Sequence, residues 1–339
     1  MTELDPLDAA LAKPTDTPQQ MRAVLAALQS LLPFPGDPRS SSDLLTLLRL
    51  LYRVARTDLP LARLLEGHVD ALQIIARYGE REVAQAATTR AAGGDLFGVW
   101  NAALTDEPLR LSEGRLWGGK SFASGAGILD HAIASADTPD GNRLVLVDLA
   151  LSQPIIDRGW WSVVGMQRSQ THIVRWEGAA PASLRLIGLP GDYAREPFFS
   201  GGALRFVACH AGGIAGLFDH VRDHLNRTGR AQDPHQSGRL ADLAIDAMVA
   251  AAAVRDAAGT WGTPVHIEHV AAARIAVAGC AERAILLAQQ AVGVSGLFTA
   301  HPLSAALTDL MVYLRQPMPD AQRMRVGAAA AQGILVPDL

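Results

Sequence analysis

Several groups of residues in this sequence contain side chains that commonly bind metals or catalyse reactions. Their spacing, however, does not match the common metal-site and hydrolase motifs. His266-Ile267-Glu268-His269 places two histidines three residues apart, whereas a zinc-protease helix needs them at i and i+4. We therefore expect this segment to lie at the protein surface, at the start of a helix, and not to bind a metal. Gly293-Val294-Ser295-Gly296 departs from the Gly-x-Ser-x-Gly elbow and follows no predicted strand, which disfavours a serine hydrolase.

Nucleotide-binding loops of the usual kinds do not occur in the sequence. It contains neither a Walker A motif nor a Gly-x-Gly-x-x-Gly segment between a strand and a helix. The glycine-rich segment 212–216 lies inside a predicted helix, where glycines indicate close helix packing. Aromatic residues are only 5% of the chain, yet Trp160-Trp161 and Phe198-Phe199 occur as pairs. Such pairs usually belong to a core, and they can also wall a flat cofactor.

The elements that would position these residues fall into three blocks. Helical periodicity and caps predict helices over about 17–31, 44–54 and 60–78, the second capped by Ser42 and Asp43. Frequent turn formers then separate short strand-like runs at 115–117, 131–134, 144–147 and 171–176, with a hairpin turn at 139–141. Helices return over 203–226, 239–258, 265–292, 302–314 and 320–332. The order indicates an α+β protein with an antiparallel sheet between helical parts.

Composition limits the classes of protein. The chain has 339 residues, 49% of them hydrophobic, and a formal charge of −4, so it can bury a large core and lacks a basic face for nucleic acid. Cys209 and Cys280 lie in apolar helical sequence and are expected to be reduced core residues. The acidic N-terminus resembles no signal peptide, and the apolar runs are too short to span a bilayer. We expect a cytoplasmic protein with no membrane contact.

Six segments, in order, resemble the acyl-CoA dehydrogenase family. They are 58–68, 98–101, 118–126, 165–171, the region around Arg205, and 290–298 followed by Pro302 and Asp309. The resemblance implies an N-terminal helical domain (1–92), a middle antiparallel β-domain (93–190) and a C-terminal four-helix bundle (191–339). It also implies FAD as cofactor and an acyl-CoA-like substrate.

The resemblance also implies roles for individual residues. Gly118-Gly119-Lys120-Ser121-Phe122-Ala123-Ser124 is similar to the family segment whose aromatic residue packs on the flavin and whose hydroxyl bonds near flavin N5, here Phe122 and Ser124. Further cofactor contacts are implied at Trp100, Asn101, Arg227, Gln290 and Gly293. Because the family's turn at 290–293 contacts the flavin of a neighbouring subunit, a homodimer or homotetramer is implied. An electron-transfer partner is a further expectation.

The resemblance departs from the family at the catalytic base. The two positions where the family carries a carboxylate correspond to Pro317 and Leu204. Glu196 and Asp309 are the nearest alternatives, and Arg205 completes the candidate catalytic set. Three hypotheses follow: oxidation of an acyl thioester between its α and β carbons, a flavin-dependent monooxygenase of the same fold, or a catalytically degenerate binding partner.

Lys120 has a distinctive place in the composition. Of 30 basic residues counted as lysine or arginine, only Lys13 and Lys120 are lysines. Strand alternation predicts that Lys120, Phe122 and Ser124 share one side of their strand.

Overall fold

The computed structural model describes residues 5–34 and 36–336, which form two compact units. The sheet unit contains the described residues up to Asp37 together with Arg63–Ser162 and Gln167–Arg195. The bundle unit contains Pro38–Ala62, Val163–Met166 and the described residues from Glu196 onward. The division falls inside helix α4 (Leu59–Tyr78), so the units group segments by packing and not by chain order. The three predicted domain ranges therefore stay a prediction.

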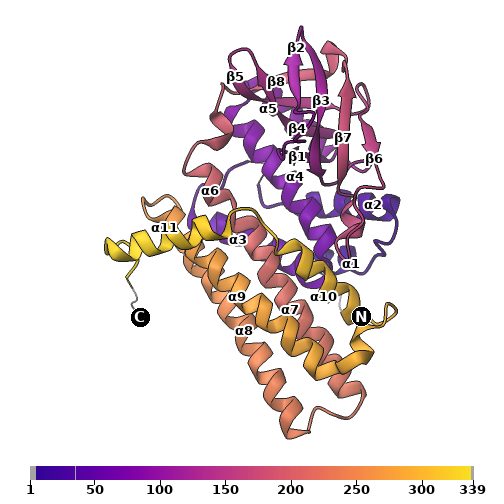
Figure 1. Cartoon of the computed structure of the whole chain (residues 1–339), viewed down its shortest axis with the longest axis vertical. Coiled ribbons are helices and arrows are strands. Elements are labelled where there is room, and N and C mark those ends of the chain that lie inside the picture. Colours follow the sequence, from indigo (N-terminus) through magenta and orange to yellow (C-terminus); the bar gives the residue numbers. More distant parts are fainter. Residues whose placement is uncertain (1–4, 35, 337–339) are drawn as a thin grey trace. The chain divides into compact units, whose positions relative to one another are not determined.

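The sheet unit is built on a strongly twisted set of strands (Figure 1). The hydrogen-bonded order is β6-β7-β3-β2-β4-β5-β8, and β1 also pairs with β4. The strands are β1 (Phe97–Trp100), β2 (Arg110–Ser112), β3 (Arg115–Ala123), β4 (His131–Thr138), β5 (Gly141–Asp148), β6 (Ile155–Asp157), β7 (His172–Glu177) and β8 (Leu184–Ile187). The predicted hairpin turn at 139–141 is confirmed between β4 and β5.

The sheet is mainly antiparallel, as expected, and it also contains two parallel pairings. Most neighbours are antiparallel, but β1 and β2 both run parallel to β4. Parallel partners need a long connection, which here is the segment between β1 and β4. The sequence pattern shows strands and turns but not which strand pairs with which.

Helices of the sheet unit are α1 (Pro6–Leu11), α2 (Pro18–Gln29), most of α4, and α5 (Arg81–Ala92). Thr17 and Gln20 form a capping box at the start of α2. One face of α4 and α5 packs on the sheet through a single apolar cluster, which includes Leu72, Ile75, Phe97, Ile133, Leu144 and Ile187. Helix α5 lies in the part of the chain predicted to be helical (1–92), but the sequence did not show its ends, because it is rich in alanine and its apolar side is narrow.

The bundle unit is helical. Its elements are α3 (Ser41–Thr57), α6 (Phe198–Gly202), α7 (Leu204–Arg227), α8 (Pro234–Gly259), α9 (His266–Val292), the 3-10 turn η4 (Gly293–Leu297), α10 (Pro302–Tyr313) and α11 (Pro319–Ala331). The cap of α3 is Ser40, whose hydroxyl accepts from the amide of Asp43, and not the predicted Ser42 and Asp43. Helix α7 packs against α3, α8, α9 and α10 and is buried along most of its length.

Small residues allow the closest helix contact, as predicted for the glycines of α7. A Cβ added to Gly212 would lie 2.3 Å from the carbonyl oxygen of Tyr52, and one on Gly216 would lie 2.5 Å from that of Arg56. Helix α3 therefore contacts α7 backbone to backbone. Cys209 and Cys280 are buried, as expected, and form no disulfide with each other.

The segment Phe198–Arg227 is the one part of the described chain with a length and composition that could cross a membrane. Of its most apolar window, 83% is buried inside the protein, as in the central helix of a bundle.

Candidate functional site

Phe122 lies at an irregularity near the end of strand β3. The pairing of β3 with β7 shifts register between Lys120 and Ala123, and Phe122 has a φ of 51°. This bulge turns the Phe122 ring outward, where 53% of the residue is exposed, while Lys120 points into the protein and is 4% exposed. The predicted alternation that placed Lys120 and Phe122 on one side was therefore wrong.

Phe122 belongs to a surface cluster of three aromatic rings. Its centroid lies 4.8 Å from that of Trp160 and 6.1 Å from that of Trp161, both edge-on, and the two indoles stack at 6.0 Å. The tryptophans follow β6 and both remain partly exposed. The cluster is an exposed apolar surface, and aromatic rings gathered in this way can wall a planar cofactor.

Ser124 is next to this cluster and ends a chain of hydroxyl groups. Thr171 donates its hydroxyl proton to Ser124 Oγ at 3.0 Å, and Ser169 lies 2.7 Å from Thr171. Because Ser124 Oγ accepts from Thr171, its own proton is free to donate elsewhere. Donors that follow one another in this way strengthen the last hydroxyl as a donor. Thr171 ends the segment 165–171 that carries the resemblance, but the sequence analysis assigned it no role in the site.

Lys120 forms hydrogen bonds on the buried side of the same sheet. Its ammonium group donates to Ser135 Oγ at 2.7 Å and to the carbonyl oxygen of Asn101 at 3.2 Å. Burial lowers the pKa of Lys120 to about 8, opposed by the charge of Asp137. Lys120 thus ties β3, β4 and the end of β1 together and does not face the aromatic cluster.

Trp100 and Asn101 act through different groups. The indole of Trp100 is 1% exposed, lies 6.0 Å from Trp176, and donates to the carbonyl oxygen of Ser124 at 2.9 Å. It therefore positions the backbone of Ser124 from the core, and its ring faces no solvent. Asn101 offers an exposed side chain, while its carbonyl oxygen accepts from Lys120.

The candidate catalytic residues of the bundle unit already have structural partners. Asp309 is 8% exposed, and its carboxylate accepts from the amide of Met166. Gly165 allows this contact, because a Cβ there would lie 2.1 Å from the carbonyl oxygen of Thr308. Glu196 is exposed and accepts from both the amide and the hydroxyl of Ser200, a residue of the short helix α6. Arg205 is 9% exposed in the first turn of α7.

The two positions expected to carry a base provide no carboxylate. Leu204 is 1% exposed in the core of the bundle. Pro317 lies in the loop between α10 and α11, and its carbonyl oxygen accepts from Arg274 at 3.0 Å. Neither position can therefore accept a substrate proton.

The remaining candidate cofactor residues lie at the surface of the bundle unit. Arg227 is the exposed last residue of α7, and Gln290 is exposed in the last turn of α9. Gly293 begins η4 with a φ of 74° and has no atom within 4 Å of an added Cβ. All three remain available for a contact outside the bundle unit.

Comparison with known proteins fixes the fold. Residues 192–314 match the family model "Acyl-CoA dehydrogenase, C-terminal domain". The chain has the acyl-CoA dehydrogenase fold. The resemblance found in the sequence is thereby confirmed, as is the α+β class with helices around a mainly antiparallel sheet.

Solved structures with the acyl-CoA dehydrogenase fold include several flavoproteins. Butyryl-CoA dehydrogenase from Megasphaera elsdenii is 16% identical, with 98% of this chain and 99% of that chain covered and a TM-score of 0.76. KijD3 in complex with FMN and a dTDP-linked keto sugar is 18% identical, with coverages of 98% and 93% and a TM-score of 0.76. TdsC from Paenibacillus sp. A11-2, in complex with FMN and indole, is 17% identical, with coverages of 97% and 97% and a TM-score of 0.73. Among curated proteins, none matches this sequence.

The fold gathers the sequence-predicted residues into two groups. Trp100, Asn101, Phe122 and Ser124 come together in the sheet unit around the end of β3. Glu196, Arg205, Asp309, Arg227, Gln290 and Gly293 belong to the bundle unit.

The expected helix start at these histidines is confirmed, since α9 begins at His266, but His266 is buried and only His269 is partly exposed. His266 is 1% exposed, and its Nδ1 lies 3.0 Å from the hydroxyl of Thr260. Within residues 5–34 and 36–336, no group of three or more His, Cys, Asp or Glu side chains is arranged to hold a metal ion.

Proposed function

We propose that this protein is a flavin-dependent monooxygenase built on the acyl-CoA dehydrogenase fold. The observation that carries the proposal is the loss of both base positions, since Leu204 and Pro317 stand where a carboxylate is expected. An acyl-CoA dehydrogenase removes a substrate proton with such a base, which typically contributes on the order of 100- to 10,000-fold to the rate. Reactions of reduced flavin with oxygen need no such proton acceptor at these positions.

The nearest carboxylates support the same conclusion. Asp309 accepts from a buried amide of Met166, and Glu196 accepts twice from Ser200. Each carboxylate has a structural task that accounts for its presence. TdsC, which has this fold, is a dibenzothiophene monooxygenase, so the fold supports oxygen chemistry as well as dehydrogenation.

The sheet unit fits a flavin. The rings of Phe122, Trp160 and Trp161 provide the apolar surface, and the hydroxyl of Ser124 has a proton to donate. A bound reduced flavin would supply the two electrons that activate oxygen. The chain would orient the ring with Phe122 and hold it with a hydrogen bond from Ser124. FAD remains our proposal from the sequence, with FMN as the alternative, because KijD3 and TdsC were both solved with FMN.

The test combines reconstitution with two reactions. The purified protein is incubated with FAD or FMN, and the bound flavin is quantified by absorbance after gel filtration. We expect no anaerobic bleaching by an acyl-CoA panel. With reduced flavin, oxygen and indole as probe, we expect oxygenated indole. Bleaching by an acyl-CoA, with no oxygenated product from indole or dibenzothiophene, would overturn the proposal.

Acyl-CoA dehydrogenation is the second candidate, favoured by two observations. Buried Arg205 and Asp309 are retained in the bundle unit, and butyryl-CoA dehydrogenase matches the chain over almost its full length. If bleaching occurs, Asp309→Asn and Glu196→Gln identify which carboxylate is the base. A protein that takes up neither flavin would instead support the third hypothesis, a catalytically degenerate binding partner.

We further propose a homodimer or homotetramer. Ile245, Met248 and Val249 form an exposed apolar stripe on α8, and Val294, Leu297 and Phe298 are more than half exposed beside Gly293. Apolar side chains gathered in this way indicate a protein contact. The second group adjoins Gln290 and Gly293, where the resemblance implies contact with another subunit's flavin. Light scattering of the wild type, Met248→Glu and Phe298→Glu tests this, and an unchanged monomeric mass in all three would contradict it.

A further inference from the structure

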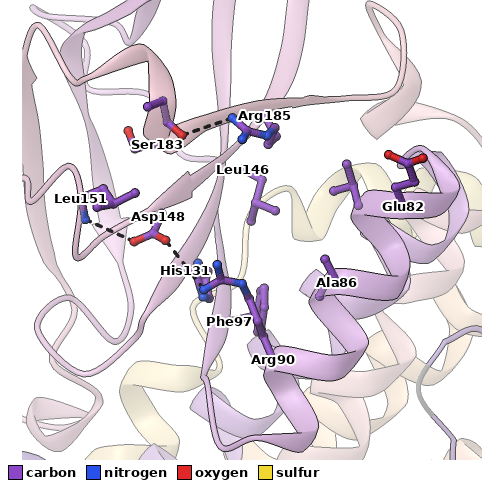
Figure 2. Close-up of a pocket in the computed structure, with 13 residues that line it drawn as sticks. Glu82, Ala86, Arg90, Phe97, His131, Leu146, Asp148, Leu151, Ser183 and Arg185 are labelled. Atoms are coloured by element: carbon purple, nitrogen blue, oxygen red, sulfur yellow. Dashed lines mark hydrogen bonds and ion pairs between the residues drawn. The ribbon is translucent and has the colours of Figure 1, made fainter.

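A cavity of about 380 Å³ opens between helix α5 and the sheet (Figure 2). It lies wholly within the sheet unit and has the size of a small-ligand pocket. None of its lining residues belongs to the candidate flavin contacts at Trp100, Asn101, Phe122 or Ser124. It is therefore a separate site, and its role does not depend on the proposed function.

Apolar side chains form most of the cavity wall. One face of α5 contributes Val83, Ala86 and Ala87, and the sheet contributes Phe97 and Leu146 opposite. These positions on α5 repeat at one-turn intervals, so they line the cavity along the helix axis. Such a wall suits the body of an apolar molecule.

Four lining residues carry formal charge: Arg90 and Arg185 are positive, and Glu82 and Asp148 are negative. Arg90, in the last turn of α5, has Nη1 3.6 Å from Asp95 and 3.8 Å from Asp148, beyond hydrogen-bond distance of either carboxylate. Arg185, at the opposite wall, donates its Nη1 to the carbonyl oxygens of Ala182 and Leu184. Both guanidinium groups line the cavity and keep donors for a ligand.

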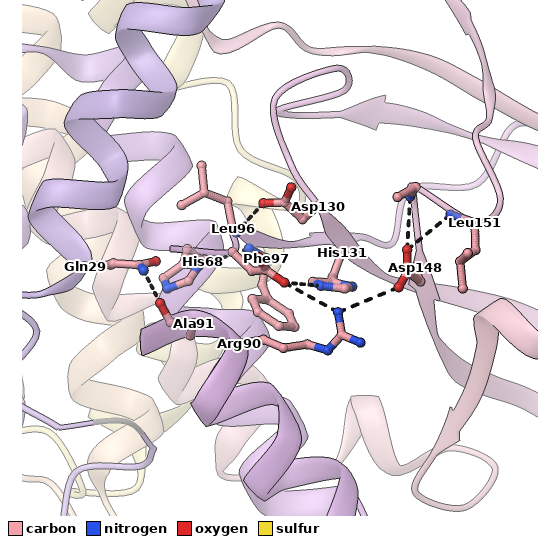
Figure 3. Close-up of polar contacts among 12 residues, drawn as sticks. Gln29, His68, Arg90, Ala91, Leu96, Phe97, Asp130, His131, Asp148 and Leu151 are labelled. Carbon is pink, nitrogen blue, oxygen red and sulfur yellow. Dashed lines mark hydrogen bonds and ion pairs between the residues drawn. The ribbon is translucent and has the colours of Figure 1, made fainter. Parts of the chain in front are cut away.

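The polar contacts around Arg90 hold its surroundings in place (Figure 3). Asp95 lies 2.9 Å from His131 Nε2, and the His131 ring stacks on Phe97 with centroids 4.6 Å apart. Asp148 accepts from the amides of Ala150 and Leu151. The two carboxylates are thus fixed by other partners, and they position Arg90 without a direct hydrogen bond to it.

We propose that this cavity binds a small monocarboxylic acid with an apolar body. The planar guanidinium of arginine matches a carboxylate through paired hydrogen bonds, and two arginines line this cavity. Glu82 lines the cavity at the other end of the α5 face, eight residues and so about 12 Å from Arg90 along the helix axis. A second carboxylate on the ligand would meet Glu82, which is why the site selects a monoacid.

Isothermal titration of the full chain tests the proposal with hexanoate and benzoate as probes. Their neutral counterparts, 1-hexanol and benzyl alcohol, measure the apolar contribution, and adipate measures the penalty of a second charge. We expect saturable binding of at least one monocarboxylate. We expect each neutral counterpart and adipate to bind about tenfold or more weakly, since hydrogen bonds to charged groups contribute that much.

Three variants locate the binding. Arg90→Gln and Arg185→Gln are each expected to weaken carboxylate binding about tenfold or more, and Ala86→Phe should abolish it by filling the cavity. Arg110→Gln, on exposed strand β2, is the matched control and should leave binding unchanged. Saturating the protein with flavin should also leave it unchanged, because the cavity shares no residue with the candidate flavin contacts. No binding of either acid, or equal binding by wild type and Ala86→Phe, would overturn the proposal.

Discussion

The ammonium group of Lys120 lies 2.7 Å from the hydroxyl of Ser135, inside a sheet where only 4% of the lysine is exposed. No carboxylate forms a hydrogen bond with Lys120 among the described residues, and its other acceptor is the carbonyl oxygen of Asn101. A charge held by neutral acceptors alone is costly to bury, and this cost depends on pH.

The pH dependence of stability follows from the lowered pKa of Lys120. Burial lowers that pKa from 10.5 to about 8, so between these values the unfolded chain binds more protons than the folded chain. The contribution of Lys120 to stability therefore rises with pH across this window, by roughly 3 kcal/mol. Chemical denaturation at several pH values should show this rise in the wild type and not in Lys120→Met. Parallel curves for the two proteins would contradict it.

Replacing the lysine by arginine tests the geometry. Lys120→Arg places a larger, planar cation in the same space and should lower flavin content and melting temperature more than Lys13→Arg, whose residue is exposed. Equal flavin content and equal melting temperatures in the two variants would show that the buried position does not require a lysine.

The hydroxyl chain predicts an effect that a purely apolar contact would not show. Thr171→Val keeps the shape and removes the donor to Ser124, so Ser124 can turn its own proton away from a bound flavin. We expect the flavin affinity of Thr171→Val to fall about three- to tenfold, and that of Ser124→Ala to fall by at least as much. Flavin fluorescence titration measures both, and Ser112→Ala, on exposed β2, serves as control. Wild-type affinity in Thr171→Val would remove this role.

The contact between α3 and α7 predicts opposite effects for two similar substitutions. Gly212→Ala should destabilise the protein by about 1–3 kcal/mol, because its Cβ would collide with the carbonyl oxygen of Tyr52. Gly238→Ala, in α8 with open space around it, should stabilise it by up to about 1 kcal/mol through helix propensity. Thermal unfolding of both variants decides, and a stabilised Gly212→Ala would refute the close contact.

Acid should destabilise the bundle unit through His210. Burial lowers the pKa of His210 to about 3, although its Nε2 donates to the carbonyl oxygen of Tyr313. Between pH 6.5 and about 3 the unfolded chain binds the extra proton, so stability falls as pH falls. We expect His210→Gln to be less stable at neutral pH and to show a shallower loss of stability in acid. Identical slopes in urea titrations across this range would count against it.

The elements predicted well are those with strong local signals. Helices with long apolar runs, such as α7 and α9, begin and end within a few residues of expectation because such runs are local properties of the sequence. The bounds of helix α5 were not predicted, because its sequence is mostly alanine and polar residues. Its place is set by packing on Ile133 and Leu144, which are distant in sequence.

The residues of the candidate site could be predicted from the sequence, but the directions of their side chains could not. Phe122 and Ser124 could be chosen from their segment, yet the bulge that separates Phe122 from Lys120 depends on the pairing of β3 with β7. In the same way, Asp309 looked like a possible base until its contact with Met166, 143 residues earlier, was visible. The role of a residue cannot be predicted from the local sequence when it depends on a partner that is distant in the chain.

The pairing of β4 carries a consequence for how the sheet assembles. Its hairpin with β5 closes over only a few residues, whereas its parallel pairing with β1 must close the whole segment between Phe97 and His131. Short loops lose less chain entropy on closure, and local contacts form faster than distant ones. We therefore expect the β4–β5 hairpin to appear first during folding and β1 to dock on it later. The Lys120–Ser135 contact, which links β3 to β4 across the short strand β2, would then form only after the hairpin exists.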